Sequence, residues 1–476
     1  MVEARMTRRR VLQCAAIAFG GALTACAPAA TPAAPSEAAG SPEATIAPAA
    51  AAGERPVVTI FVGMGTGTAP EQQEVQDSLA AEWNASGSDI AIEYMYVPHD
   101  ESRTKWATMM AAGTPPAINM PSGVEQTGRF QDTNLDIGPY LERDQYDLSD
   151  FGDLIPEIGK YGGITYGVVM GVYPSVLYYN EDLFDQAEVD YPTHEWGASD
   201  WDYDAMVEMA QKLSRDGSDR SSATEGFDPE DQTQWGYDEI QCGLLINALA
   251  QSWGAENMGW SDDFRTLYFN QPAWVERLQW VSDAIWKWYI MPSAQQTAAA
   301  APGFDSGKLG IDQCHSWMMG EFAELEFHWN AGAIPSGPAG KIVAQCDVDG
   351  FLICNQFADL DAAWEVAKWM MEPDQMLRLN LTWGALPPRA SLQERYIEEM
   401  SSKFPNVDLQ VFFGSLGYID IPNQETYLPR YGEIWDAFYA GLDRIVTGDE
   451  KSAQVVLDDV QATVQGYLDE HWAQQS

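Results

Sequence analysis

The side chains that most often carry out chemistry are present without the spacing that catalysis or metal binding requires. Only five histidines occur, and none forms an i, i+4 pair or an array with cysteines, so we expect no metal site. The run from Asp347 to Gly350 resembles the start of a calcium loop but lacks the downstream glutamate, and we interpret it as a turn. Gly63, Gly65 and Gly67 depart from the G-x-G-x-x-G spacing, which favours a tight strand-to-helix turn over a nucleotide site. No cofactor is expected.

Acidic side chains are very abundant. The chain has 71 Asp and Glu residues against 26 Lys and Arg, a formal charge of −45. Such a chain repels phosphate backbones, which excludes nucleic acid as a partner. Two opposed carboxylates could be drawn from so many, so a secreted glycoside hydrolase or lyase stays open as an alternative. A surface adhesin or structural lipoprotein is a third class and would need no closed pocket.

Aromatic side chains are the other chemical resource of this sequence. It contains 18 Trp and 20 Tyr residues, more than a core alone needs. Aromatic rings stack on the apolar faces of sugars, while charged and amide groups satisfy the hydroxyls. Ligands of open α/β sheets bind at the carboxyl ends of strands. Gly65 and Thr66 end the first predicted strand, and Ser122 and Glu125 follow the third, so we expect all four near a ligand.

A strand–helix–strand unit is predicted to position these residues. Residues 57–62 are β-branched and strand-like, a helix follows with Val75, Leu79 and Trp83 on one face, and a second strand runs from Ile90 to Val97. This pattern predicts an α/β fold with a parallel sheet. Farther along, Asp200 is predicted to cap a helix that ends near Leu213.

The N-terminus has the pattern of a targeting signal. Three arginines precede an apolar run of small residues that is too short for a permanent membrane helix, and Cys26 follows directly. The pattern resembles a bacterial lipoprotein signal, so residues 1–25 are expected to be removed and Cys26 to be acylated. Residues 26–56 are rich in Ala and Pro and predict a flexible tether. The protein is therefore expected outside the cytoplasm, held to the membrane only by its lipid. Twin-arginine export and ordinary export both stay open.

The remaining four cysteines do not force a pairing. Oxidation is permitted outside the cell, yet buried thiols are equally consistent with a domain of this size. Their disulfide state stays open for Cys242, Cys314, Cys346 and Cys354.

From residue 104 onward the chain resembles the extracellular solute-binding proteins of ABC importers, in the sugar-binding group that includes maltodextrin-binding protein. Five segments match motifs of that group in order and spacing, and Ala117 stands where the group usually has aspartate. The matching segments are TKWATMMAAGTPP at 104–116, GITYG at 163–167, LYYNEDLF at 177–184, FDSGKLGIDQCHSW at 304–317 and GALPPR at 384–389.

The resemblance implies a two-lobed clamshell with ligand between the lobes, each lobe built from separated segments. One lobe is expected to comprise residues 57–170 and 354–415, the other residues 171–353 and 416–476. The chain would cross between them near residues 168–176, 349–354 and 414–422, which act as hinges.

The resemblance also implies function. We expect a monomer that binds a carbohydrate, specifically an oligosaccharide, and delivers it to the transmembrane subunits of an ABC permease without catalysis. A receptor for a non-sugar solute is a further alternative. Trp317 and Trp435 fall on tryptophans that stack sugar in maltodextrin-binding proteins, and Tyr173 on a hinge-side polar contact that is glutamate there. Trp253 and Trp383 are additional candidates.

Overall fold

A computed structural model describes residues 55–123, 128–152, 155–240, 249–256, 258–419 and 427–475. The predicted signal, the acylated Cys26, residues 26–54 of the tether, Glu125 and Cys242 lie outside the described residues. Within the described part, Cys314 is disulfide-bonded, whereas Cys346 and Cys354 are buried and not disulfide-bonded.

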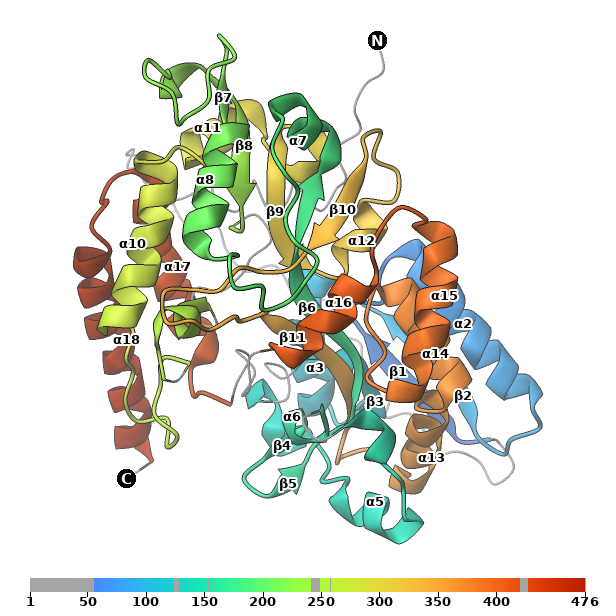
Figure 1. The fold of residues 1–476 in the computed structure, drawn as a ribbon. Helices are drawn as coiled ribbons and strands as arrows, with labels where there is room; N and C mark the ends of the chain where they lie inside the picture. The colour runs from blue at the N-terminus through green and yellow to red at the C-terminus, as the bar shows by residue number, and fades with distance from the viewer. Residues whose placement is uncertain are drawn as a thin grey trace, which may run out of the picture. The chain divides into compact units, whose positions relative to one another are not determined.

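The chain opens with the predicted strand–helix–strand unit (Figure 1). β1 (Val57–Val62) pairs in parallel with β2 (Ala91–Tyr96) along its whole length, and α2 (Pro70–Ala85) connects them. Leu79 is buried on α2, and Val75 and Trp83 pack half-buried on the same side. The α/β class predicted from the sequence is thus confirmed.

The described strands form one mixed sheet of nine strands and one small hairpin. The order in the large sheet is β2-β1-β3-β11-β6-β9-β8-β7, with β10 pairing to β6. The remaining strands are β3 (Ile118–Ser122), β4 (Lys160–Tyr161), β5 (Ile164–Thr165), β6 (Val169–Asn180), β7 (Arg215–Asp216), β8 (Gln232–Asp238), β9 (Leu309–His315), β10 (Trp329–Gly332) and β11 (Cys346–Ile353).

The strand β6 joins the two ends of the sheet. Its first half, through Pro174, pairs with β11, and its second half, from Ser175, pairs with β9 and β10. All twelve residues of β6 are buried, as expected for a strand covered on both faces.

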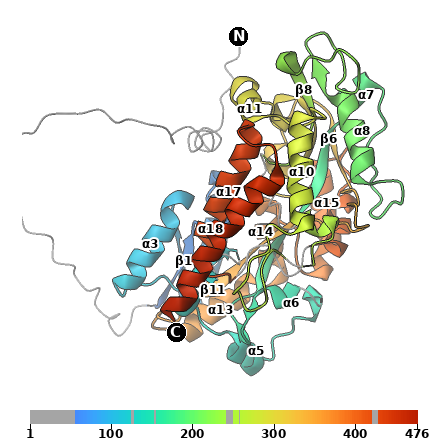
Figure 2. The same ribbon diagram turned by 90° about the vertical axis from the view of Figure 1, so that its left-hand side faces the viewer.

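Helices cover the sheet, and Figure 2 shows α17 and α18 side by side along one flank. The further described helices are α3 (His99–Ala111), α5 (Gly138–Asp144), α6 (Ile155–Ile158), α7 (Glu181–Ala187), α8 (Tyr203–Leu213), α10 (Pro272–Trp286), α11 (Ala294–Ala300), α12 (Met318–Glu321), α13 (Leu360–Met370), α14 (Pro373–Trp383), α15 (Gln393–Lys403), α16 (Gln410–Gly414), α17 (Tyr431–Thr447) and α18 (Ala453–Gln474).

Two large apolar cores lie around the sheet. One packs β1, β2 and β3 against α2, α13 and α14 and continues to α12 and β10, and the other packs α8, α10, α17 and α18. Because side chains alternate along a strand, Tyr178 of β6 belongs to the first core while Leu177 and Tyr179 belong to the second.

Two local predictions are wrong. The cap of α8 is Asp202, whose side chain accepts a hydrogen bond from the backbone N–H of Ala205, and not Asp200. The helix starts later because Asp202 is still extended and bridges Ser336. Residues 347–350 form no turn: they lie within β11, where pairing with β6 keeps them extended.

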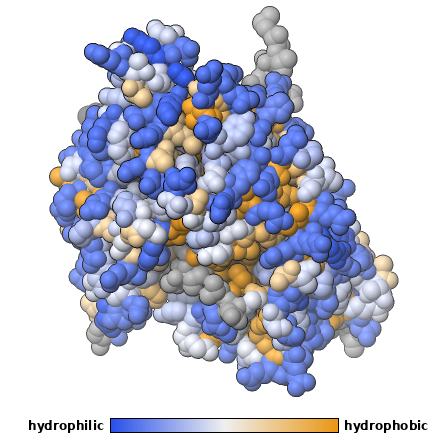
Figure 3. All heavy atoms as spheres, in the orientation of Figure 1, coloured by the Kyte–Doolittle hydropathy of each residue, from blue (hydrophilic) through white to orange (hydrophobic). Residues whose placement is uncertain are grey.

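Hydrophilic residues cover most of the face drawn in Figure 3, around smaller hydrophobic patches. No helix in the described ranges combines the length and the apolarity needed to cross a bilayer.

Candidate functional site

Three side chains from three different elements meet at the centre of the sheet. Thr66 lies in the loop between β1 and α2, Tyr173 on β6 and Asp349 on β11. Asp349 Oδ2 accepts hydrogen bonds from the Thr66 backbone N–H at 3.2 Å, from Thr66 Oγ1 at 2.9 Å and from the Tyr173 hydroxyl at 3.1 Å. Gly65 is required beside them, because a Cβ there would collide with the Asp349 carboxylate.

Burial dominates the electrostatics of this cluster. Tyr173 is 1% exposed and Asp349 5% exposed, whereas Thr66 is half-buried. Desolvation raises the pKa of Asp349, and hydrogen bonds from Thr66 and Tyr173 oppose that rise. Burial, followed by the charge of Asp349, raises the pKa of Tyr173 well above its ordinary value, so its hydroxyl keeps its proton.

Trp317 forms an aromatic platform next to this cluster. It follows β9 directly, is half-buried and meets the Tyr173 ring edge-on at a centroid distance of 5.5 Å. Its indole stacks on the imidazole of His315 at 4.1 Å with an interplanar angle of 16°. Gly384, with φ of 72°, lets the turn after α14 approach the Trp317 backbone, since a Cβ there would lie 2.9 Å from Trp317 Cα.

His315 supports the platform as a neutral ring. It is 1% exposed, and burial lowers its pKa to about 3. Its Nδ1 atom has no hydrogen-bond partner among the described residues. Its Nε2 atom lies 3.7 Å from Asp347 Oδ2.

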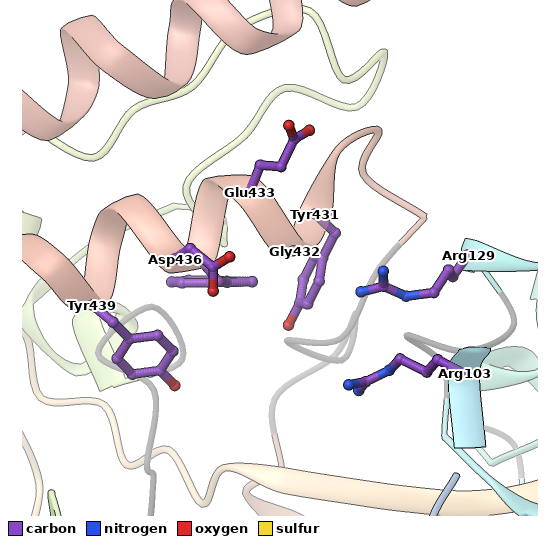
Figure 4. A pocket seen from close by; sticks show the side chains of 8 residues that line it. Arg103, Arg129, Tyr431, Gly432, Glu433, Asp436 and Tyr439 are labelled. Atoms are coloured by element: carbon purple, nitrogen blue, oxygen red, sulfur yellow. The ribbon is translucent and has the colours of Figure 1, made fainter. Parts of the chain in front are cut away.

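A cavity of about 470 Å³ lies along the first turns of α17. Figure 4 shows Arg103 and Arg129 extending toward Tyr431 from one side, with Asp436 and Tyr439 on the α17 side. Glu433 also lines the cavity, and its carboxylate pairs with Arg430. The remaining lining residues are Gly432 and Trp435.

Asp347 acts electrostatically on one residue of this cavity. Burial raises the pKa of Tyr439, and the charge of Asp347 adds to that rise. Asp347 also neighbours His315, on which Trp317 stacks. A second cavity of about 520 Å³ shares Arg129, Tyr431, Gly432 and Glu433 with the first and continues past Tyr427 and Trp472.

Five of the nine predicted site residues lie at the sheet centre or at the α17 cavity. Gly65, Thr66, Tyr173 and Trp317 come together at the sheet centre. Trp435 lines the α17 cavity, but it is only 4% exposed and packs into the second core, and its indole N–H has no partner among the described residues.

The other predicted residues have structural neighbours. Ser122 ends β3 beside Met64, and its hydroxyl accepts a hydrogen bond from Asn119. Trp383 ends α14, and its indole donates to Gln76, whose amide in turn donates to the Gly67 carbonyl, so it supports the loop that carries Thr66.

Trp253 lies in the second core. Its ring packs against Tyr203 and Trp280, and the guanidinium of Arg277 lies 4.8 Å from it. Glu125, the last predicted site residue, falls outside the described residues.

Sequence reasoning missed the residues that hold the predicted ones. Asp349, His315 and the arginines Arg103 and Arg129 were not selected. For Asp349 a signal existed: Asp347 and Asp349 are spaced by two, which on a strand places both on one face. Nothing in the sequence marked the arginines, because their elements meet α17 only in the folded chain. Among the described residues, no group of three or more His, Cys, Asp or Glu could hold a metal ion.

Comparison with solved structures shows what this fold resembles. An ABC substrate-binding protein of Listeria monocytogenes, in complex with cycloalternan, matches with a TM-score of 0.70 and 19% identity over 87% of this chain and 99% of its own. A cyclic α-maltosyl-1,6-maltose-binding protein of Arthrobacter globiformis matches with a TM-score of 0.69 and 20% identity, over 87% of this chain and 100% of its own. A sugar-binding protein of Xanthomonas citri matches with a TM-score of 0.68 and 16% identity, over 88% of this chain and 99% of its own. These likenesses confirm the predicted α/β fold of the two-lobed binding proteins.

Sequence comparison identifies the family. A binding protein of Brucella abortus is 23% identical over 328 residues, which cover 67% of this chain and 73% of that protein. Residues 78–406 match the bacterial extracellular solute-binding proteins, a family of binding proteins and not of enzymes. The chain therefore belongs to the bacterial extracellular solute-binding protein family.

Proposed function

We propose that this protein captures an oligosaccharide between two lobes outside the cytoplasm and delivers it to the permease of an ABC importer. The observation that carries the proposal is the arrangement at the sheet centre. A half-buried indole, Trp317, stands edge-on to Tyr173, which with Thr66 and Asp349 forms a compact polar group. A flat apolar surface beside fixed polar oxygens fits a sugar ring and its hydroxyls.

The α17 cavity is also consistent with binding of a solute between two lobes. With lobes of residues 57–170 and 354–415 and of residues 171–353 and 416–476, Arg103 and Arg129 belong to one lobe and Tyr431, Trp435 and Tyr439 to the other. A solute held there would contact both lobes. Closure would then be favoured by contacts that only a bridging solute provides.

Strand pairing supports the placing of the hinges. β6 and β11 are the paired strands at the predicted crossings, and Tyr173 and Asp349, from one strand each, are hydrogen-bonded to each other. Residues 420–426 of the third predicted crossing lie outside the described residues.

The neighbours favour a saccharide as the solute, since the Listeria protein is in complex with cycloalternan and the Arthrobacter protein is named for binding cyclic α-maltosyl-1,6-maltose. The two adjoining cavities would give an oligosaccharide room beyond a single ring. Acylation of Cys26 would hold the receptor near its permease, with residues 26–56 as the tether.

Calorimetric titration of the purified chain tests the proposal. The probes are maltotriose, cycloalternan, glucose, an amino acid mixture and spermidine. We expect saturable heat from an oligosaccharide with a dissociation constant near micromolar, about −8 kcal/mol. Binding of the amino acids or spermidine, with no heat from any saccharide, would replace the proposed substrate class, and turnover of a glycan would favour a hydrolase.

A further inference from the structure

The hydroxyl of Thr66 has too many oxygen neighbours for its single proton. Thr66 Oγ1 lies 2.9 Å from Asp349 Oδ2 and 3.0 Å from the Tyr173 hydroxyl, which itself lies 3.1 Å from the same carboxylate oxygen. Three oxygens thus form a triangle with three short edges. The two hydroxyls bring only two protons, and an ionised carboxylate brings none.

The charge of Asp349 decides where those protons point. Among the described residues, Oδ2 is surrounded by groups that can donate to it: the Thr66 backbone N–H, the Thr66 hydroxyl and the Tyr173 hydroxyl. These donors favour the ionised carboxylate and oppose the rise in pKa that burial causes. Hydrogen bonds to an ionised acceptor are stronger than those between neutral hydroxyls. If the Thr66 proton pointed outward, a lone pair of Oγ1 would face the carboxylate at 2.9 Å, which is repulsive. The Thr66 proton therefore points inward, toward Asp349.

We propose that Asp349 is the positioning residue of this site and fixes Thr66 as a hydrogen-bond acceptor for the solute. This inference rests on the proposed function. Thr66 is the half-buried member of the triangle, and Tyr173 and Asp349 are buried behind it. Its lone pairs select a solute that presents an O–H or N–H donor at this point, such as a sugar hydroxyl, over one that presents an ether or carboxylate oxygen.

The geometry around Asp349 explains why another residue could not position the Thr66 hydroxyl in the same way. The carboxylate is pressed against Gly65, so a longer glutamate side chain has no space. Asparagine fits, but its amide oxygen carries no charge and accepts weaker hydrogen bonds than the carboxylate, and its NH2 group has no acceptor among the donors that surround Oδ2.

A stability cycle tests the network without any ligand. Urea unfolding is measured for the full chain and for Thr66→Val, Asp349→Asn and the double variant. We expect the two substitutions to be coupled by about tenfold in the unfolding equilibrium constant, because Thr66→Val removes the charge-assisted hydrogen bond between Thr66 and Asp349 and Asp349→Asn weakens the same bond. If the effects of the two substitutions on the unfolding equilibrium constant multiply independently, to within a factor of two, the proposed hydrogen-bond network is wrong.

Calorimetry with maltotriose and cycloalternan tests the role toward the solute. Thr66→Val is expected to weaken the tighter probe at least tenfold, and Thr66→Ser to restore it to within about threefold. Asp349→Asn should cost about as much as Thr66→Val, and the double variant little more. If Thr66→Val binds the saccharide as tightly as the unaltered chain, or if the two affinity losses multiply in the double variant, Asp349 does not position Thr66 for the solute.

Two controls separate positioning from general damage. Thr59→Val removes a hydroxyl from β1 that bonds Glu93 near the surface, and Asp216→Asn alters a buried carboxylate bonded by Arg220. Both are expected to change stability and leave affinity unchanged. If the unaltered chain binds neither saccharide, the proposed function fails together with the solute role of Thr66, while the stability cycle still decides whether the network exists.

Discussion

The neutral His315 beneath Trp317 makes a quantitative prediction about acid. Burial lowers the pKa of this imidazole to about 3, whereas an unfolded histidine titrates near 6.5. Below pH 6.5 the His315 imidazole is therefore protonated in the unfolded chain and stays neutral in the folded chain. The stability that depends on a neutral ring is fully present above pH 6.5 and is lost as the pH falls toward 3, by about 1.4 kcal/mol per pH unit.

The perturbation is His315→Phe, which keeps a ring under Trp317 and removes the titrating group. From the two pKa values, linkage predicts that the unfolding free energy of the unaltered protein falls by about 2 kcal/mol between pH 7 and pH 5. The variant should not show this loss. The assay is urea unfolding followed by circular dichroism at both pH values. The other acidic and basic groups are common to both proteins, so their contributions cancel in the comparison.

His328→Asn is the matched control. His328 is exposed and bonds Asp182, and that hydrogen bond, followed by the charge of Asp182, raises its pKa. Its contribution is therefore stabilising below its unfolded pKa and is lost as the pH rises, the opposite sign to His315. If His315→Phe and the unaltered protein lose stability equally between pH 7 and pH 5, the imidazole is protonated inside the fold and the reasoning is wrong.

Three further predictions concern binding and the second core. Trp317→Ala should weaken oligosaccharide binding about tenfold or more in calorimetry with little change in the urea midpoint, and equal affinity would remove Trp317 from the site. Trp435→Ala should weaken binding and also cost about 3–5 kcal/mol of unfolding free energy, because most of this indole is packed in the second core; a stability loss without an affinity loss would make it a core residue only. Arg277→Met should destabilise by about 3–5 kcal/mol in urea unfolding, because it leaves the buried carboxylate of Glu239 without its ion pair, and a loss under 1 kcal/mol would contradict that pairing.

Local sequence patterns predict much of the fold. The β-branched run 57–62 and the helical stripe of Val75, Leu79 and Trp83 predicted the opening unit correctly, because hydrophobic periodicity is a local property. The cap of α8 was misplaced by two residues, because a bridge to Ser336 extends the chain through Asp202. Such a pairing, between segments far apart in sequence, leaves no local signal.

The candidate site could be predicted only in part for the same reason. Strand ends indicated Gly65 and Thr66, and the family resemblance indicated Tyr173 and Trp317, and the structure brings these four together. No local pattern predicts the role of Asp349, since two aspartates before a glycine favour a turn when strand pairing is unknown. Arg103 and Arg129 face α17 only because distant segments meet.

The decisive experiment is a crystal structure of the protein with the saccharide that binds most tightly in calorimetry. We expect a sugar ring against Trp317, a ligand hydroxyl donating to Thr66 Oγ1, and further rings toward Trp435 and Tyr431. A saccharide bound away from both the sheet-centre cluster and the α17 cavity would contradict it.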